Sequence, residues 1–303
     1  MELSDLRIFL AVSRTSGITR AAQELHTVQS NISARINALE KELGVSLFRR
    51  HARGVALTNA GERLLPYAER IDRLMDEARC AVDDEADPSG SLRVGAMETT
   101  AGLRLPAVLS AFADNHPRVD LSLTTGPTDD LVHAVLDYHL DGALVAGPVR
   151  LDELLETEVF VEELVIVTAG RVTELDTVLR SPKILVFRAG CSYRRRLENI
   201  LLARGAVGVR CLEFGTLEGI LGCVAAGMGI TLLPAGVVEQ SASRELVRVH
   251  PLPEAERWAG TVFVRRADVP PPPAVSRFLD HLRTASQTPN LRIVEGATSA
   301  EQQ

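Results

Sequence analysis

A pair of short helices joined by a tight turn is predicted by residues 18–37, which read ITRAAQELHTVQSNISARIN. The spacing of the apolar residues gives a helix on each side of a turn at 26–28. Ala22 lets the two helices approach closely, and Ile32 anchors the second helix on the first. The exposed face of the second helix then presents amide, hydroxyl and guanidinium groups, namely those of Gln29, Ser30, Asn31, Ser33 and Arg35.

Two interpretations of this polar face follow. Amide, hydroxyl and guanidinium groups on a helix can contact base edges or phosphates of DNA, and the backbone N–H groups of a helix N-terminus can bind a phosphate. The alternative is a solvent-facing helix in an ordinary three-helix bundle, whose first helix would be the apolar stripe over 3–12. Spacing alone leaves both interpretations open.

The charge distribution favours a polyanionic partner for the N-terminal segment. Residues 1–60 carry eight basic and five acidic side chains, a net charge of +3, and the rest of the chain carries −10, for a total of −7. The apolar flanks of 47–57 predict a small hairpin, and three arginines lie in it: Arg49, Arg50 and Arg53. A basic head on an acidic body is typical of a protein whose head alone meets nucleic acid.

A long helix is predicted to begin at Thr58 or Asn59. Its apolar positions are separated by alternating steps of four and three residues, and they are Leu64, Ala68, Ile71, Met75, Ala78 and Val82. This is the spacing of a coiled-coil seam, and a helix so charged on its other faces needs a partner. The seam therefore predicts self-association; the alternative is packing on the chain's own C-terminal domain.

After an acidic stretch that reads as a hinge, the pattern alternates between short strands and helices. The predicted strands cover 92–96, 119–125, 142–146, 158–168, 184–187, 209–214 and 229–233. The predicted helices between them cover 101–112, 131–136, 192–204 and 217–226. Such alternation indicates an α/β fold with parallel sheets, in which ligands bind at the carboxyl ends of the strands.

Several loops at those strand ends carry hydroxyls and glycines. The candidate ligand-binding residues in them are Thr99, Thr100, Thr125, Gly126, Thr128, Gly147, Pro148, Cys191, Ser192 and Tyr193. Helix N-termini with hydroxyls favour an anion such as a carboxylate. The alternative for each Thr or Ser is ordinary helix capping.

Residues 1–64 resemble the N-terminal domain of LysR-type transcriptional regulators. The resemblance rests on the blocks ITRAAQEL, QSNIS, IxxLExELGVxLFxR and LTxAG. It implies an N-terminal winged helix-turn-helix, a dimerising linker helix, and a C-terminal effector domain of two α/β subdomains like those of periplasmic binding proteins. The implied plan assigns 1–58 to DNA binding (helix-turn-helix 18–37), 59–84 to the linker helix, 85–90 to a hinge and 91–285 to the effector domain. Within the effector domain, subdomain I covers about 91–162 and 268–285 and subdomain II about 163–267, and we expect a disordered tail over 286–303.

The resemblance also implies roles and partners. Gln29, Ser30 and Ser33 are candidates for base edges and Arg35 for base or phosphate, while the hairpin arginines would contact phosphates or the minor groove. The expected partners are double-stranded DNA with imperfect inverted symmetry, a second copy in a dimer or tetramer, a small anionic or amino-acid-like effector, and RNA polymerase.

Two departures from the family pattern occur in the predicted recognition helix. Val28 and Ala34 stand where the family often has Ser and Arg, so we expect Thr27 to take over the cap of this helix. The runs METTAGLRLP, TGPT, DGALVAGPV and CSYRRRLE resemble a subgroup that includes regulators of putrescine use.

Other classes of function find little support in the sequence. It contains no GxSxG, HExxH or GxxxxGK[ST] motif, and its seven histidines lack metal-ligand spacing. We therefore expect no enzyme, no metal and no cofactor. No apolar run reaches the ~18 residues that a membrane span needs, and the four cysteines form no CxxC pair. A cytoplasmic protein without a membrane partner is expected.

Two rival functions remain. Cys191 lies at a predicted helix N-terminus beside arginines at 194–196, which would lower the thiol pKa and allow redox sensing. Cys211 and Cys223 are expected to fill core positions. The other rival is a solute-binding α/β protein or an enzyme with a helical appendage.

Overall fold

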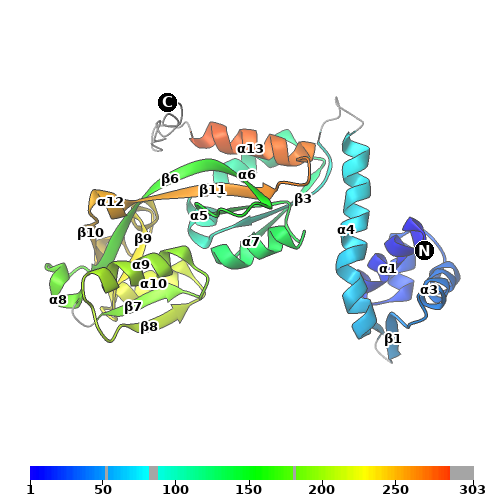
Figure 1. Ribbon diagram of the computed structural model, residues 1–303, viewed down its shortest axis with the longest axis horizontal. Helices are drawn as coiled ribbons and strands as arrows, with labels where there is room; N and C mark the ends of the chain where they lie inside the picture. Colours follow the sequence, from blue (N-terminus) through cyan, green and yellow to red (C-terminus); the bar gives the residue numbers. More distant parts are fainter. Residues whose placement is uncertain (52–53, 82–87, 180–181, 287–303) are drawn as a thin grey trace. The chain divides into compact units, whose positions relative to one another are not determined.

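The computed structural model describes residues 1–51, 54–81, 88–179 and 182–286, and the chain divides into two compact units, Met1–Ala86 and Asp87–Gln303 (Figure 1). Each unit has its own hydrophobic core. The fold combines an N-terminal helix-turn-helix with an α/β domain.

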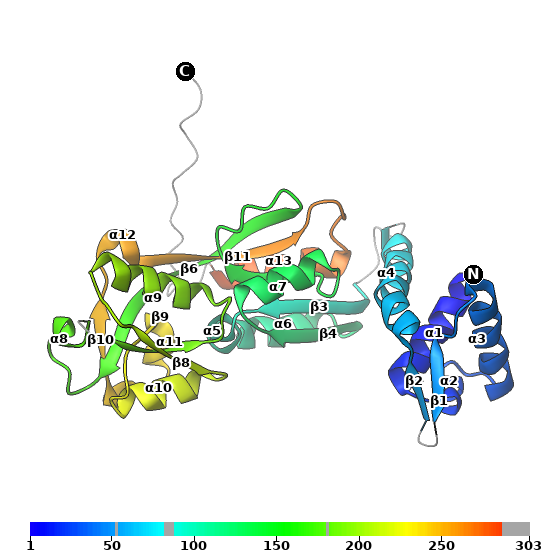
Figure 2. The same cartoon turned by 60° about the horizontal axis from the view of Figure 1, so that its bottom comes forward.

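The first unit consists of four helices and a two-stranded hairpin (Figure 2). The elements are α1 (Leu3–Thr15), α2 (Ile18–Glu24), α3 (Gln29–Leu43), β1 (Phe48–His51), β2 (Gly54–Leu57) and α4 (Asn59–Ala81). Phe9, Ile32 and Leu39 are fully or almost fully buried at its centre. Gly44 ends α3 with a φ of 70°, a left-handed conformation that glycine adopts without the steric cost of a Cβ.

The hairpin is tied to the helices at both ends. The backbone N–H of Val55 donates to the carbonyl of Ser16 at 3.2 Å. Gly54 has a φ of 140°, and a Cβ there would lie 2.7 Å from that same carbonyl oxygen, so only glycine fits. At the other end, the Thr58 hydroxyl accepts from the N–H of Gly61 at 3.2 Å and thereby caps α4.

Only part of the predicted seam of α4 is available for contact with a second copy. Ala68 is fully buried in the core of the first unit, and Leu64 and Ile71 pack against that core. These residues therefore cover α1 of the same chain, which corrects the prediction that the whole seam faces a partner. Periodicity marks the buried face but not the element that buries it. Met75 is half-buried and Ala78 exposed, and Val82 lies outside the described residues.

The second unit contains nine strands and nine helices among its described residues. The strands are β3 (Gly90–Ala96), β4 (Val119–Thr125), β5 (Gly142–Ala146), β6 (Leu154–Ala169), β7 (Lys183–Phe187), β8 (Arg210–Phe214), β9 (Thr231–Pro234), β10 (Val247–Pro251) and β11 (Trp258–Arg266). The helices are α5 (Glu98–Leu103), α6 (Leu105–Asn115), α7 (Thr128–Leu136), α8 (Leu175–Leu179), α9 (Ser192–Ala203), α10 (Leu217–Ala225), α11 (Ala235–Glu239), α12 (Glu254–Arg257) and α13 (Pro273–Ser286), with one 3-10 turn, η1 (Arg244–Leu246).

Two lobes share the long strands β6 and β11 (Figure 1). Lobe I holds β3, β4 and β5, and lobe II holds β7, β8, β9 and β10. Residues 154–163 of β6 pair with β11, and residues 164–169 pair with β9 and β10, so β6 changes lobes at the step from Glu163 to Leu164. The part of β11 from Thr261 to Val264 pairs with β5 in lobe I, although the sequence-based boundaries assigned it to subdomain II.

The prediction of parallel sheets is only partly correct. β3 pairs in parallel with β4 and β5, and β7 pairs in parallel with β8. β6 is antiparallel to β9, β10 and β11, and neither β10 nor β11 was predicted from the sequence. The physical reason is that the chain crosses between lobes on one long strand and returns along it.

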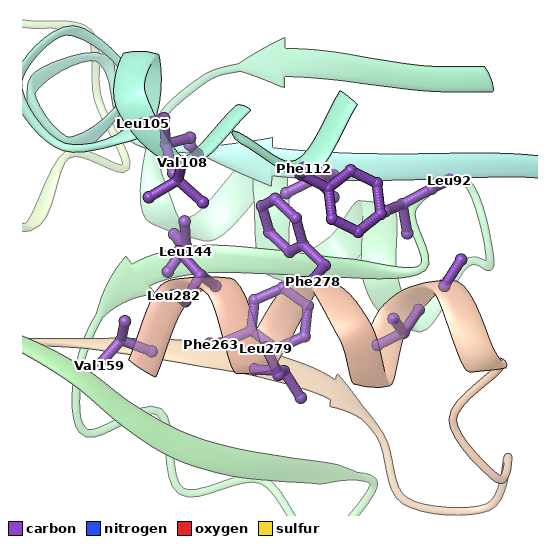
Figure 3. Packing of buried hydrophobic residues seen from close by; sticks show 14 of the residues in the cluster. Leu92, Leu105, Val108, Phe112, Leu144, Val159, Phe263, Phe278, Leu279 and Leu282 are labelled. Atoms are coloured by element: carbon purple, nitrogen blue, oxygen red, sulfur yellow. The ribbon is translucent and has the colours of Figure 1, made fainter. Parts of the chain in front are cut away.

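The core of lobe I is closed by the C-terminal helix α13 (Figure 3). Phe278 of α13 is fully buried, and its ring meets the Phe112 ring edge-on with centroids 5.4 Å apart. Phe263 of β11 lies on the other side, 6.3 Å from Phe278. The last described helix is thus part of the domain core.

Candidate functional site

The N-terminus of α3 is the first candidate site. Gln29, Ser30 and Asn31 are exposed and Ser33 is half-buried. The Gln29 carboxamide oxygen accepts from the Thr19 hydroxyl of α2 at 3.2 Å, which orients the amide. No side chain caps this helix, because its N-cap residue is Val28. Its first backbone N–H groups can therefore bind an anionic group such as a phosphate.

The expected cap by Thr27 is wrong. The Thr27 hydroxyl accepts from the side-chain amide of Asn31 at 3.0 Å and not from a backbone N–H of the helix. Val28 is 64% exposed at the tip of α3, and an exposed branched apolar side chain at such a position can contact a thymine methyl group. Sequence reasoning missed Val28 as a candidate because it sought only polar groups. It also missed exposed Asn37, which lies four residues after Ser33 on the same face.

Arg35 is half-buried, and ion pairs hold its side chain against α1, which the sequence did not predict. Its guanidinium Nε lies 2.7 Å from Asp5 and its Nη2 lies 3.0 Å from Glu2, both at the start of α1. Arg35 also contacts the Ser4 hydroxyl. The arginine therefore joins α3 to α1, an arrangement that the i, i+4 pattern of α3 alone does not reveal.

The hairpin places basic residues at the edge of the same unit. Arg49 is exposed on β1, opposite Ala56 in the ladder. Arg50 is in β1 opposite Val55, and Arg53 lies outside the described residues. β1 and β2 are antiparallel with a register that pairs His51 with Gly54. A short, basic hairpin beside the helix pair is suited to contact the phosphate backbone.

The second candidate site is an open cavity of about 570 Å³, including the space at its mouth, between the lobes of the second unit. It lies where four strands end: β3 and β4 from lobe I, and β7 and β8 from lobe II. The lobes also touch beside it, because the N–H of Asp129 donates to the carbonyl of Gly190 at 3.5 Å. Strand ends at such a crevice are the usual place for ligand binding in α/β folds.

Six of the ten predicted residues line this cavity. They are Thr99, Thr125, Gly126, Thr128, Cys191 and Tyr193. The remaining lining residues were not among the ten candidates, and they are Met97, Glu98, Pro127, Phe187, Arg188, Phe214 and Gly215. Four of these end or directly follow β7 and β8; the strand-end rule reached the later part of the loop after β7 but was not applied to β8.

The other four predicted residues do not line the cavity. Gly147 donates its N–H to the carbonyl of Gly260 at 3.0 Å, and a Cβ on it would lie 2.6 Å from Val262. The loop after β5 therefore stays on β11, and Gly147 and Pro148 are kept from the cavity. Thr100 is fully buried, and Ser192 begins α9 with its hydroxyl oxygen buried.

The chemistry of the lining is mixed. Arg188 supplies a cation and Glu98 a carboxylate, while Phe187 and Phe214 supply aromatic surface. The N-terminus of α7 begins at Thr128, whose hydroxyl lies 3.6 Å from the sulfur of Met97. Such a site can hold a small molecule that has a carboxylate, a cationic or neutral donor group and an apolar body.

A buried carboxylate stands behind the cavity wall. Glu162 of β6 is 3% exposed; one of its oxygens accepts from the Tyr193 hydroxyl at 3.2 Å and the other from Arg104 Nε at 3.2 Å. Burial raises the pKa of Glu162, and the charge of Arg104 opposes that rise. Burial and the negative charge of Glu162 raise the pKa of Tyr193 well above its usual value.

We predict that the free energy of unfolding falls less with rising pH in Glu162→Gln than in the wild type. Because the folded pKa of Glu162 is raised, its contribution to stability is fully present below the unfolded pKa of about 4.3 and is lost as pH rises through the folded pKa. Glutamine does not titrate. Urea unfolding of both proteins at a series of pH values from about 4 to 8 measures this, and equal pH slopes for the two proteins would contradict it.

The redox expectation for Cys191 is not supported by its surroundings. Burial raises the pKa of the Cys191 thiol, and this outweighs the backbone N–H groups and arginines that lower it. Cys211 is exposed, which corrects its expected place in the core, whereas Cys223 packs partly buried against the lobe II core. Among the described residues, no group of three or more His, Cys, Asp or Glu is arranged to hold a metal ion. No described helix is both long and apolar enough to cross a membrane.

Both units match models of known protein families. Residues 3–62 match the model for bacterial regulatory helix-turn-helix proteins of the lysR family, and residues 85–287 match the model for the LysR substrate binding domain. Among solved structures, full-length OxyR from Pseudomonas aeruginosa is 22% identical with a TM-score of 0.71, covering 98% of this chain and 99% of that one. CbnR in complex with its target DNA is 24% identical with a TM-score of 0.66, covering 94% of this chain and 100% of that one. At these identities the structures show the shared fold.

Curated relatives extend over nearly the whole chain. The transcriptional regulator GltR of Bacillus subtilis is 40% identical over 93% of this chain and 96% of its own length. YofA of Bacillus velezensis is 45% identical over 89% of this chain and 93% of its own length. Both are named as transcriptional regulators and not as enzymes, and the comparisons give no support to the putrescine subgroup. The chain belongs to the LysR family of DNA-binding transcriptional regulators.

Proposed function

We propose that this regulator binds an operator of imperfect inverted symmetry as a dimer or a tetramer, and that a small effector in the lobe cavity controls it. The observation that carries the proposal is the uncapped, exposed N-terminus of α3 with its row of polar side chains. A two-fold symmetric protein matches two half-sites related by symmetry in DNA. A regulator of chromosomal DNA would work in the cytoplasm.

The proposed DNA contacts divide by chemistry. Gln29, Ser30 and Ser33 contact base edges in the major groove, with Asn31 at the side of the same turn. Arg49, Arg50 and Arg53 of the hairpin contact phosphates and set the salt dependence of binding. Arg35 contributes less to DNA binding than these residues, because its guanidinium is already paired with Asp5 and Glu2.

We predict that Gln29→Ala weakens operator binding by about 1–3 kcal/mol and relaxes base preference at one position of each half-site. The reason is that its oriented amide pairs with a base edge and not with a phosphate. The operator is first selected from random DNA, and affinities are then measured on single-base variants. Exposed Gln240 of the other unit provides the matched control, Gln240→Ala. An equal loss on every DNA sequence would contradict the role of Gln29.

The proposed dimer contact uses a face of α4 that shares Ile71 and Ala78 with the predicted seam and adds Tyr67 and Leu74. Tyr67 is 65% exposed, Leu74 is 60% exposed and Ala78 is also exposed, whereas Ile71 is half-buried. In chain order, Tyr67, Ile71, Leu74 and Ala78 are separated by four, three and four residues. This is again the spacing of a two-helix seam. Exposed apolar side chains at this spacing on a 23-residue helix favour pairing with the same helix of a second copy.

The proposed effector is a small amino-acid-like molecule. Arg188 and the N-termini of α7 and α9 favour its carboxylate, Glu98 favours an amino group, and Phe187 with Phe214 favours an apolar side chain. Thermal unfolding in the presence of amino acids and of the matching acids without the amino group tests this class. A ligand at 100 times its Kd would stabilise the folded state by about 2.7 kcal/mol. If no compound raised the Tm, or if Arg188→Gln left every shift unchanged, the proposed effector site would be wrong.

A further inference from the structure

The buried carboxylate of Glu162 occupies a special place in the second unit. It lies on β6 beside the step from Glu163 to Leu164, where the strand stops pairing with β11 and begins pairing with β9. Its side chain is almost entirely shielded from solvent, although it carries a carboxyl group. A buried carboxylate is costly unless hydrogen bonds and an opposite charge compensate it.

The compensating groups come from different lobes. Arg104 stands between α5 and α6; its guanidinium lies over the Phe160 ring at 5.7 Å, and Leu105 next to it is buried in the lobe I core. Tyr193 belongs to α9, is buried in the lobe II core and lines the cavity. Glu162 therefore accepts one hydrogen bond from each lobe at the strand that joins them.

This arrangement makes the lobe orientation depend on three side chains. If the lobes turn relative to each other about β6, either the bond to Arg104 or the bond to Tyr193 must lengthen. The group left unpaired would then be a buried charge or a buried hydroxyl, both of which are unfavourable. A ligand that moves the Tyr193 ring acts on the same hydrogen bonds. It shifts the equilibrium between two lobe orientations only if it binds one orientation more tightly than the other.

We propose that Glu162 is a positioning residue of the effector response, which joins Tyr193 in the cavity wall to Arg104 of lobe I and so couples the cavity to the lobe orientation. This inference rests on the proposed effector function of the cavity. Arg104 itself does not line the cavity. Any effect of Arg104 on the cavity wall must therefore pass through other residues. Glu162 accepts hydrogen bonds from both Arg104 and the wall residue Tyr193 and so connects them.

The test measures the accessibility of Cys191, which lies in the cavity wall two residues from Tyr193. The full chain is alkylated with iodoacetamide, and the rate at Cys191 is followed by peptide mass spectrometry, with exposed Cys211 as the internal reference. We expect Arg104→Gln, Glu162→Gln and Tyr193→Phe each to raise the Cys191 rate at least about fivefold without changing the Cys211 rate. The double variant of Arg104→Gln with Tyr193→Phe should react no faster than the faster single variant.

Controls separate coupling from general loosening. Arg93→Gln breaks a similar partly buried pair in lobe I, with Asp141 at 3.0 Å, and should leave the Cys191 rate unchanged. Arg104→Lys keeps the charge and should give a rate closer to that of the wild type. An unchanged rate in Arg104→Gln, multiplicative effects in the double variant, or an equal effect of Arg93→Gln would each overturn the inference. Because no ligand is present, this result is independent of the thermal-shift test of the proposed effector.

Discussion

Replacing Leu74 with glutamate is expected to separate the dimer and to weaken operator binding at least about 100-fold. Leu74 is 60% exposed on α4, at the centre of the proposed Tyr67–Ala78 seam. In a dimer, two glutamates would face each other in an apolar contact, where unpaired charges are strongly disfavoured. A single subunit also loses the second half-site, and with it the gain that comes from binding two linked sites at once.

Sedimentation of the full chain and titration of a selected operator measure the two effects. Leu246→Glu is the matched control, because Leu246 is 62% exposed but belongs to the second unit. It should leave both the mass and the operator affinity unchanged. A Leu74→Glu protein that keeps the wild-type mass and binds the operator normally would show that α4 does not form the dimer contact.

Truncating Phe278 to alanine is expected to destabilise the second unit by about 3–5 kcal/mol. Phe278 is fully buried, and it holds α13 against Phe112 and Phe263 in the lobe I core. The loss combines the transfer of a large apolar side chain with a cavity that three packed elements can close only in part. The stability of the first unit should not change, because that unit has a separate core.

Urea unfolding followed by far-UV circular dichroism measures this loss. Arg277→Ala, at an exposed position next to Phe278 on the same helix, should change stability by less than about 0.5 kcal/mol. A loss below about 1 kcal/mol for Phe278→Ala would mean that α13 is not an integral part of the core. A second expected consequence is weaker ligand binding, since Thr99 and Thr125 are carried by elements of the same lobe.

The local elements of the first unit could be predicted because their signals are local. Apolar spacing, Gly17 and Gly44 mark the ends of α1 and α3, and the turn at 26–28 separates the two short helices. Each of these features depends on residues within a few positions of each other. The position of Arg35 could not be predicted, because its carboxylate partners are about 30 residues away in the chain.

Only some of the residues that line the cavity were predicted from the sequence. Residues after β3, β4 and β7 were found because a strand followed by a helix is visible in the sequence. The contribution of β8 could be found by the same rule, but the approach of β7 and β8 to β3 and β4 depends on how the two lobes close. Glu162 carried no local signal, since a Glu in an alternating strand ordinarily faces solvent.

By itself, the sequence determined the helix-turn-helix, the α/β class of the second unit and the family. These follow from periodic patterns and from blocks of residues that lie together in the chain. Only the tertiary structure decided which face of α4 is covered by α1, which loops meet at the cavity, and that Arg104 and Tyr193 share one buried carboxylate. The physical reason is that burial and hydrogen bonding depend on distances in space, which a one-dimensional pattern fixes only for near neighbours.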